Sequence, residues 1–383
     1  MSTPRIREHP KDFIVEEIAT IDPVEDGDHL LMQVEATDLD HHSMVRRLAE
    51  AHGVDRRQVG WAGMKDKRAV TRQWITIKTP GEAVLVDDED LKICEALRCS
   101  KRRRPGALLG NRFEIIVRGV EPTELLSVMP AMRTVAEQGL PNRFGPQRFG
   151  HRGINPILGR AMLLDDTETL LRSWLGQEGP AWPEGEIDRR RLFDQGRFED
   201  ALRLWPKVWN AERSALAALH RTGRTEDAVR SVQPRIRGFW VDALQSVLFN
   251  DVLARREADG LLQHIGDDDI VSVFSRFHDF LGDTVGPERV ATGPLFGRNM
   301  RPAGVSVAAV EREVLAQHGL DEALFKDGRS APGGARRPFV VPVLRAAAES
   351  GVDDRGGYLK LKFSLPRGAY ATTLLSALGL DLD

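Results

Sequence analysis

The sequence has 383 residues, too many for one ordinary core, which indicates two domains or one domain with a large insertion. With 41% hydrophobic and 29% charged residues, the composition is that of a folded globular protein and not of a disordered one. The formal net charge of −3 argues at first against a nucleic-acid partner, and no apolar run approaches the roughly 20 residues that span a bilayer.

The N-terminal third has the pattern of an α/β domain. Alternating or β-branched runs predict strands, and apolar residues at helical spacing predict helices. The expected strands cover 12–18, 28–36, 69–78 and 112–119, and the expected helices cover 43–52 and 123–139.

The middle of the chain is predicted to be mostly helical, over 157–232 and in one long amphipathic helix over 238–260. These helices show no fixed period, which argues against a solenoid. After a Pro/Gly/Arg-rich segment at 331–338, a strand over 356–368 and a helix over 369–380 return to the α/β pattern. The order suggests a helical insertion into a continuous domain, whose final strand we expect to pair with the N-terminal sheet.

The weak net charge hides an uneven distribution. Residues 56–118 contain 15 Lys/Arg against 8 Asp/Glu, and the remaining residues carry 39 basic against 49 acidic groups. A local positive patch is sufficient for binding phosphates. The densest run is Lys101-Arg102-Arg103-Arg104, which is either a solvated basic loop or a phosphate contact.

Several kinds of chemistry lack their motifs. The sequence has no phosphate-binding G-x-x-x-x-G-K-[ST], H-E-x-x-H, C-x-x-C or G-x-S-x-G, and no strand-linked G-x-G-x-x-G. The adjacent histidines His41 and His42 would point about 100° apart at a helix start, which suits a shared metal ion poorly. Cys94 and Cys99 are too few for a disulfide framework or a four-thiolate zinc site. We therefore expect no metal and a reducing cytoplasm, and the N-terminus lacks the apolar core of a secretory signal.

One acidic residue stands in a basic turn. Asp66 lies within Gly63-Met64-Lys65-Asp66-Lys67-Arg68, directly before an expected strand. Such a position exposes the side chain and is common for functional residues, although an acidic residue in a basic turn is also an ordinary surface feature. The surrounding cations favour the anionic form of Asp66 and attract phosphates.

The motif around Asp66 resembles the signature of the TruD family of pseudouridine synthases. Further segments resemble blocks of that family in the same order: HPKDFIVEE (9–17), RRPGALLGNRFEIIVRGV (103–120), PNRFGPQRFG (141–150), LQSVLFNDVLA (244–254), GPLFG (293–297) and LPRGAYATTLL (365–375). These blocks follow one another in order from one end of the chain to near the other, which argues strongly against a chance match.

The resemblance implies an isomerase that converts a uridine of tRNA, usually at position 13, into pseudouridine. The reaction breaks the N1–C1′ bond and forms a C5–C1′ bond, and it needs no cofactor. Asp66 would be the catalytic carboxylate, as nucleophile or as base. The target uridine must be flipped out of the folded RNA to be reached. Lys65, Lys67, Arg68, Arg102 and Arg103 would contact RNA phosphates.

The same resemblance implies further substrate-binding residues. Phe144 would stack on the uracil, Asn142 would hydrogen-bond near it, and Phe13 would belong to the base pocket. From pattern alone, both phenylalanines read as core residues. Tyr370 stands where the family usually has Phe and would keep an aromatic wall. Arg7 stands where the family often has Lys and would pair with Asp66, unless it is simply an exposed arginine.

The implied fold is an α/β (α+β) pseudouridine synthase domain with a mixed, largely antiparallel sheet flanked by helices. This catalytic domain would cover 1–155 and 338–383, and a mostly helical inserted TRUD domain would cover 156–337. We expect a monomer without membrane contact whose partner is tRNA. The alternatives are a catalytically inactive tRNA-binding or RNA-remodelling protein, which would not need Asp66, and an RNA methyltransferase, which would need a glycine-rich cofactor loop.

Overall fold

The computed structural model describes residues 4–150, 152–177 and 182–380. The chain folds into two compact units. The first unit contains Met1–Asn142, Val273–Arg289 and Val340–Asp383, and the second contains Arg143–Ser272 and Val290–Phe339. Among the described helices, none combines the length and apolar character that crossing a bilayer requires.

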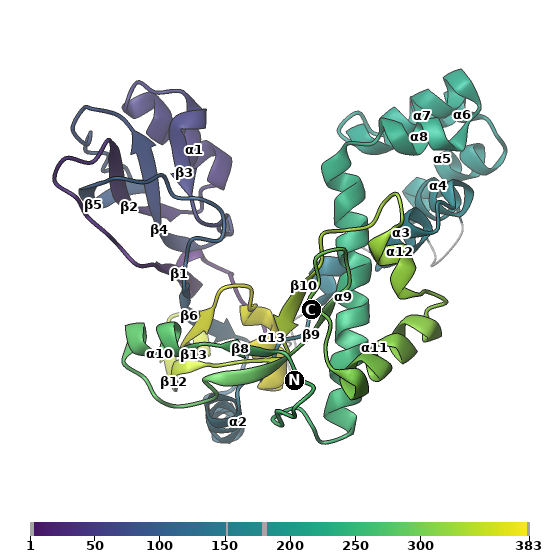
Figure 1. Cartoon of the computed structure of the whole chain (residues 1–383). Coiled ribbons are helices and arrows are strands. Elements are labelled where there is room, and N and C mark those ends of the chain that lie inside the picture. Colours follow the sequence, from purple (N-terminus) through teal and green to yellow (C-terminus); the bar gives the residue numbers. More distant parts are fainter. Residues whose placement is uncertain (1–3, 151, 178–181, 381–383) are drawn as a thin grey trace. The chain divides into compact units, whose positions relative to one another are not determined.

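A mixed sheet of eight strands forms the frame of the first unit (Figure 1). Its order is β12-β13-β6-β1-β4-β2-β5, with β3 paired to β4. Within the described part of this sheet, only the pairing of β1 with β4 is parallel. The sheet strands are β1 (Phe13–Ile18), β2 (His29–Thr37), β3 (Val59–Trp61), β4 (Val70–Lys78), β5 (Leu91–Cys99), β6 (Gly110–Arg118), β12 (Leu344–Asp353) and β13 (Gly356–Pro366). Strand β13 pairs with β6 along its length, which confirms the expected pairing of the last strand with the N-terminal sheet.

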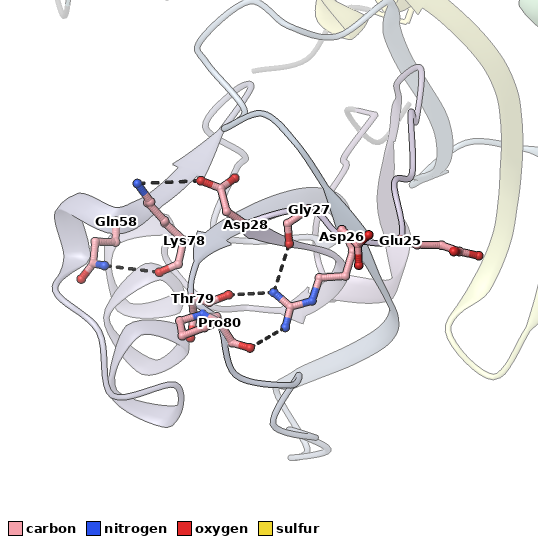
Figure 2. A pocket seen from close by; sticks show the side chains of 9 residues that line it. Glu25, Asp26, Gly27, Asp28, Gln58, Lys78, Thr79 and Pro80 are labelled. Atoms are coloured by element: carbon pink, nitrogen blue, oxygen red, sulfur yellow. Dashed lines mark hydrogen bonds and ion pairs between the residues drawn. The ribbon is translucent and has the colours of Figure 1, made fainter.

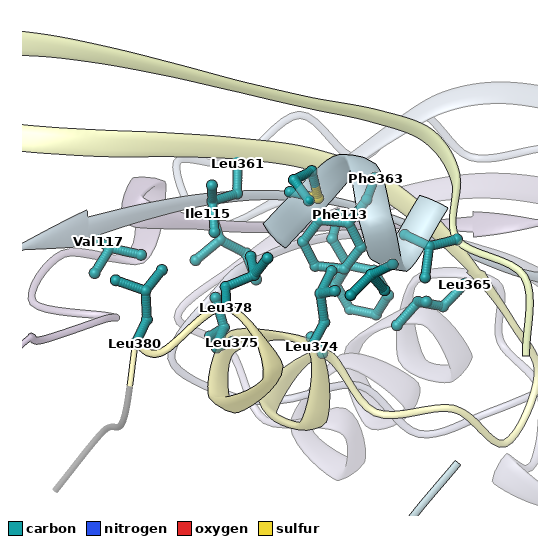
Figure 3. Close-up of a cluster of buried hydrophobic side chains, with 14 of the residues drawn as sticks. Phe113, Ile115, Val117, Leu361, Phe363, Leu365, Leu374, Leu375, Leu378 and Leu380 are labelled. Carbon is teal, nitrogen blue, oxygen red and sulfur yellow. The ribbon is translucent and has the colours of Figure 1, made fainter. Parts of the chain in front are cut away.

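Helices cover this sheet where its side chains are apolar. They are α1 (His41–Ala51), α2 (Leu125–Gln138), α10 (Ser275–Leu281) and α13 (Ala371–Ala377). Because strand side chains alternate between faces, Phe113, Ile115 and Val117 point to one side of β6. Figure 3 shows Leu374 and Leu375 of α13 packed against that side. A second core lies between α1 and strands β2 and β4.

A short strand pair also belongs to the first unit: β7 (Leu140–Pro141) pairs antiparallel with β11 (Val340–Val341). Gly139, just before β7, has a φ of 84°, and a Cβ there would lie 2.3 Å from a methyl carbon of Val340. Only glycine fits this approach. This close approach lets β7 pair with β11, although the two strands lie about two hundred residues apart in the chain.

The second unit is mostly helical, as the sequence predicts. Its helices are α3 (Asn155–Leu163), α4 (Thr167–Leu175), α5 (Glu184–Asp194), α6 (Phe198–Leu204), α7 (Asn210–Thr222), α8 (Thr225–Ser231), α9 (Pro234–Ala258), α11 (Val305–Gln317) and α12 (Glu322–Lys326). Helices α3 and α11 pack against α9, the long rod in Figure 1. Gly159 permits the contact of α3, since a Cβ there would lie 2.1 Å from the carbonyl oxygen of Trp240. A small sheet of β8 (Val271–Val273), β9 (Arg289–Leu295) and β10 (Ala335–Pro338) lies mostly in this unit.

The expected fold class is confirmed: a mixed, largely antiparallel sheet with flanking helices accompanies a mostly helical unit. The chain passes from one unit to the other between residues 142 and 143, 272 and 273, 289 and 290, and 339 and 340. The assignment of 1–155 with 338–383 to catalysis and of 156–337 to an insertion stays a prediction.

Candidate active site

Asp66 lies in the loop that joins β3 to β4. The loop leaves the sheet after Trp61 and re-enters it where Ala69 and Val70 are buried. Between these anchors a turn is closed by the Ala69 amide, which donates to the Lys67 carbonyl at 2.9 Å. The Asp66 side chain is 56% exposed, so the fold presents a carboxylate to solvent at the entrance of a buried strand.

Arg7 holds one oxygen of this carboxylate. Its Nη2 donates to Oδ2 of Asp66 at 2.6 Å, and its guanidinium carbon lies 4.0 Å from the ring centroid of Phe13. The backbone of Arg7 has a φ of 61°, in the left-handed region that non-glycine residues rarely adopt. Within the described residues, the Oδ1 atom of Asp66 has no bonded partner. The pair expected from the sequence is therefore formed, and it leaves one carboxylate oxygen open to a substrate atom.

A buried charged cluster supports the loop from the sheet. Arg103 donates to Oε1 of Glu17 at 2.5 Å, and the side chains of the two residues are 11% and 0% exposed. Lys65, the neighbour of Asp66, donates to Oδ1 of Asn111. Burial raises the pKa of Glu17, an effect that Lys65 and Arg103 oppose. Burial likewise lowers the pKa of Lys65, while Glu17 and Asp66 act in the other direction. The charges of Glu17, Lys65 and Arg103 thus stabilise one another.

His41 packs beside the start of the loop. Its ring lies edge-to-face on Trp61 at 4.9 Å between centroids, and neither ring nitrogen has a hydrogen-bond partner within the described residues. Burial, with a smaller contribution from His42, lowers the pKa of His41 to about 4. In the described parts of the chain, no three His, Cys, Asp or Glu side chains gather as metal ligands. His41 is a buried neutral ring at the beginning of α1.

Some basic residues near Asp66 are exposed to solvent, and others form hydrogen bonds within the first unit. Lys67 and Arg68 are exposed around Asp66. The guanidinium of Arg102 donates to the Val59 carbonyl at 2.5 Å, although much of the residue is exposed, and Arg103 contacts Glu17 as described. Arg98 donates to the carbonyls of Thr79 and Pro80 at 2.7 and 2.9 Å, beside a pocket of about 500 Å³ (Figure 2). Much of the basic run therefore fastens loops of the first unit.

The remaining expected site residues are distributed over both units. Asn142 ends the first segment of the first unit and is buried, and Tyr370 stands exposed at the start of α13. Phe144 belongs to the second unit. The backbone of Phe144 exchanges two hydrogen bonds of 2.9 Å with the Asn250 amide, and its ring contacts Phe249 and, at 4.0 Å, the guanidinium of Arg337. Arg7 joins two other expected site residues directly, through its contacts with Asp66 and with Phe13.

Glu17 and Asn111 were not expected at the site. A signal for Glu17 exists in the sequence, because Phe13, Val15 and Glu17 share one face of the strand by alternation. A carboxylate in line with two core residues must be buried, and a buried charge requires a cationic partner. Asn111 stands in the family-like block over 103–120, but nothing in that block predicts its contact with Lys65, which depends on how the loop folds back onto β6.

The chain is similar to known proteins over nearly its whole length. The sequence profile described as tRNA pseudouridine synthase D (TruD) matches residues 2–378. The tRNA pseudouridine synthase D of Geobacter metallireducens is 35% identical, over 97% of this chain and 93% of that protein. A probable tRNA pseudouridine synthase D of Methanopyrus kandleri is 36% identical, over 92% of this chain and 86% of that protein.

A solved structure has the same fold. The crystal structure of the putative tRNA pseudouridine synthase D (TruD) from Methanosarcina mazei superposes with a TM-score of 0.81 at 27% identity, covering 100% of this chain and 95% of that one. The mixed sheet, the exposed carboxylate and these similarities lead to one conclusion. The chain belongs to the TruD family of tRNA pseudouridine synthases.

Proposed function

We propose that this protein is a tRNA pseudouridine synthase that isomerises a uridine of tRNA, at position 13 as is usual in its family. The observation that carries the proposal is the Asp66 carboxylate, exposed on a loop and held through one oxygen by Arg7 at 2.6 Å, in a chain of this family. The open oxygen Oδ1 can reach an atom of an extruded nucleotide.

The proposed reaction requires one acidic group and no net consumption of a co-reactant. The N1–C1′ bond breaks, the uracil turns, a C5–C1′ bond forms, and the C5 hydrogen is lost while N1 gains a proton. Asp66 acts as nucleophile toward the sugar or as base. Arg7 is a positioning residue, because it fixes the orientation of the carboxylate while packing on Phe13.

The roles of the other residues follow from the family resemblance. We assign Phe13, Asn142, Phe144 and Tyr370 to binding of the target nucleotide. For Phe144, its packing against Phe249 also supports a role in the core of the second unit.

Of the proposed phosphate contacts, Lys67 and Arg68 have the exposure that the role needs. Arg102 is exposed as a residue even though its Nη2 is bonded to the protein. For Lys65 and Arg103, the contacts with Asn111 and Glu17 support a role in holding the loop.

The setting of the reaction is also part of the proposal. We assign catalysis to the first unit, which carries Asp66, and a role as the inserted domain to the second. We propose a monomer that works in the cytoplasm on tRNA. The two free thiols, Cys94 and Cys99, are compatible with a reducing compartment.

Replacement of the carboxylate tests the proposal. In Asp66→Asn, the rate of tritium release from tRNA labelled at C5 of uridine should fall by at least about 10³-fold. Affinity for tRNA, measured by filter binding, should survive because the amide keeps the shape of the side chain. Asp22→Asn, an exposed carboxylate on the loop between β1 and β2, serves as control. Full activity of Asp66→Asn would overturn the assignment. If the wild-type protein binds tRNA but releases no tritium, the protein is instead a catalytically inactive tRNA-binding or RNA-remodelling protein.

A further inference from the structure

A pocket of about 390 Å³ lies in the first unit, outside the Asp66 site. Arg112 of β6 and Lys362 and Ser364 of β13 line it, together with Phe280 and Arg345. Along these strands, the residues in between belong to the core under α13. Because neighbouring residues point to opposite faces, the pocket opens on the sheet face opposite to Phe13.

The pocket combines apolar walls, which include Phe113, Leu281 and Phe363, with charged side chains. Three basic side chains line it, Arg112, Lys362 and Arg345, against the single carboxylate of Glu114. Glu114 is already paired with Lys360 on the neighbouring strand. Glu16 and Glu349 contact Arg112 and Lys362 from outside the lining, at 3.3 and 3.2 Å. Arg345 is therefore the one lining cation without an ion pair within the described residues, and it is the side chain best able to hold an anion.

Arg345 is held at the pocket by an unusual backbone. Its φ is 53°, and the pairing of β12 with β13 shifts register between Leu344 and Ala347. Two contacts fix the conformation: the Arg345 amide donates to Asp283 at 2.7 Å, and its Nε donates to the Leu281 carbonyl at 3.1 Å. Within the described residues, Nη1 of Arg345 has no acceptor. Strained backbone and bulges of this kind are concentrated where a side chain must be aimed.

Ser364 supplies an unpaired polar atom. Its side chain is 0% exposed, and its Oγ has no hydrogen-bond partner within the described residues. It stands between Leu344 and Arg112 in the sheet register. A buried hydroxyl without a partner is unfavourable, and a ligand in the pocket can supply the missing bond once a neighbouring side chain shifts to uncover Oγ.

Phe280 adds an aromatic surface. It lies near the end of α10, where its neighbour Leu281 is buried against Ile18 and Leu344. Phe280 itself remains 50% exposed. A half-exposed ring beside cations is the combination that binds a base together with its phosphate.

We propose that this pocket binds one nucleotide, with the base on Phe280, the phosphate among Arg112, Lys362 and Arg345, and a hydrogen bond to Ser364. Its volume falls within the range of small-ligand sites. The nucleotide comes either from the cellular pool or from a bound RNA, and both sources present the same chemistry. The proposal does not depend on Asp66, because it concerns binding on the other face of the sheet.

Equilibrium dialysis of the full chain with uridine 5′-monophosphate tests this site. Phe280→Ala and the double variant Arg112→Ala/Lys362→Ala should each weaken binding by at least about fivefold. Phe280→Trp should restore the affinity. Leu126→Ala and Lys92→Ala, an exposed apolar residue on α2 and an exposed, paired cation on β5, should leave it unchanged. Thermal unfolding of every variant checks that the fold is kept.

Steady-state kinetics on tRNA then identify the source. A raised KM with unchanged kcat in the pocket variants assigns the site to a nucleotide of RNA, whereas weakened binding of the monophosphate with unchanged KM assigns it to a free nucleotide. If neither the monophosphate affinity nor KM changes in either variant, the proposal is wrong. Loss of activity in Asp66→Asn affects none of these outcomes, so the two proposals fail separately.

Discussion

Two carboxylates of the first unit, Asp66 and Glu17, stand beside basic side chains and yet serve opposite needs. Asp66 is 56% exposed and is held through one oxygen, while Glu17 is 0% exposed and contacts Arg103. An exposed ion pair contributes little to stability, whereas a buried charge that loses its partner is strongly destabilising. The loop of Asp66 is therefore free to carry chemistry because Glu17 and its partners hold the sheet beneath it.

The largest effect on folding is expected for Glu17→Ala. This change leaves the guanidinium of Arg103 and the ammonium of Lys65 without their shared carboxylate, and the free energy of unfolding should fall by about 3–5 kcal/mol. Urea denaturation measures it. Glu16→Ala, on the opposite face of the same strand, removes a partly exposed contact with Arg112 and a weaker attraction to Arg72, and should cost no more than about 1 kcal/mol. Equal losses in both variants would remove the distinction between the two carboxylates.

His41 predicts how stability depends on pH. Its pKa is about 4 in the folded protein and 6.5 ordinarily, so the unfolded chain binds the proton first as pH falls. Stability should be complete above pH 6.5 and should decrease by up to about 3 kcal/mol as pH falls to about 4. His41→Phe keeps the contact with Trp61 and should abolish this part of the decrease, while His42→Phe at the exposed neighbour should not. Identical pH profiles for wild type and His41→Phe would contradict the assignment.

Arg7→Ala tests the role of the ion pair at the exposed carboxylate, Asp66. Without the guanidinium, Asp66 loses its bond at 2.6 Å and its fixed orientation, so kcat should fall about 10- to 100-fold at nearly constant KM. Arg7→Lys should recover part of the rate, because an ammonium can still reach the carboxylate. Unchanged kcat in the alanine variant would show that the pair is incidental.

The smallest effect is expected for the exposed cations around Asp66. Lys67→Ala/Arg68→Ala should reduce the slope of log affinity for tRNA against log salt by about 1–2 and leave unfolding unchanged. Filter binding at several salt concentrations measures the slope. Arg355→Ala, in the exposed turn between β12 and β13, is the control. An unaltered slope would exclude both side chains from the RNA interface.

The sequence predicts those elements whose own pattern is strong. The helix over 238–260 appears within α9 because its apolar residues recur at helical spacing, and the strand over 69–78 appears as β4 because it is rich in β-branched and aromatic residues. Strand β5 was not expected: it lies at the edge of the sheet, and its middle residues, around Cys94 and Glu95, are exposed, so its alternation is broken. Edge strands owe their conformation to one neighbour more than to their own residues.

At the candidate site, sequence reasoning predicts the contact of Arg7 with Asp66, which the structure contains, while the catalytic role of Asp66 stays a prediction. It does not identify the cluster of Glu17 with Lys65 and Arg103, since those contacts join residues 17, 65 and 103 and exist only after the strands are paired. The roles of Asn142, Phe144 and Tyr370 stay predictions. The buried packing of Phe144 on Phe249 shows why a ring in such a motif cannot be assigned to a ligand from its spacing alone.

The position of β13 has a consequence for how the protein is made. This strand pairs with β6, which itself pairs with β1, although some 240 residues separate β6 from β13 in the chain. During synthesis, the edge of β6 stays uncovered until the ribosome has translated the entire second unit. Closing such a long loop is slow, so the second unit can fold first. We therefore expect the protein to become able to modify RNA only after β13 has paired with β6, late in translation or after it.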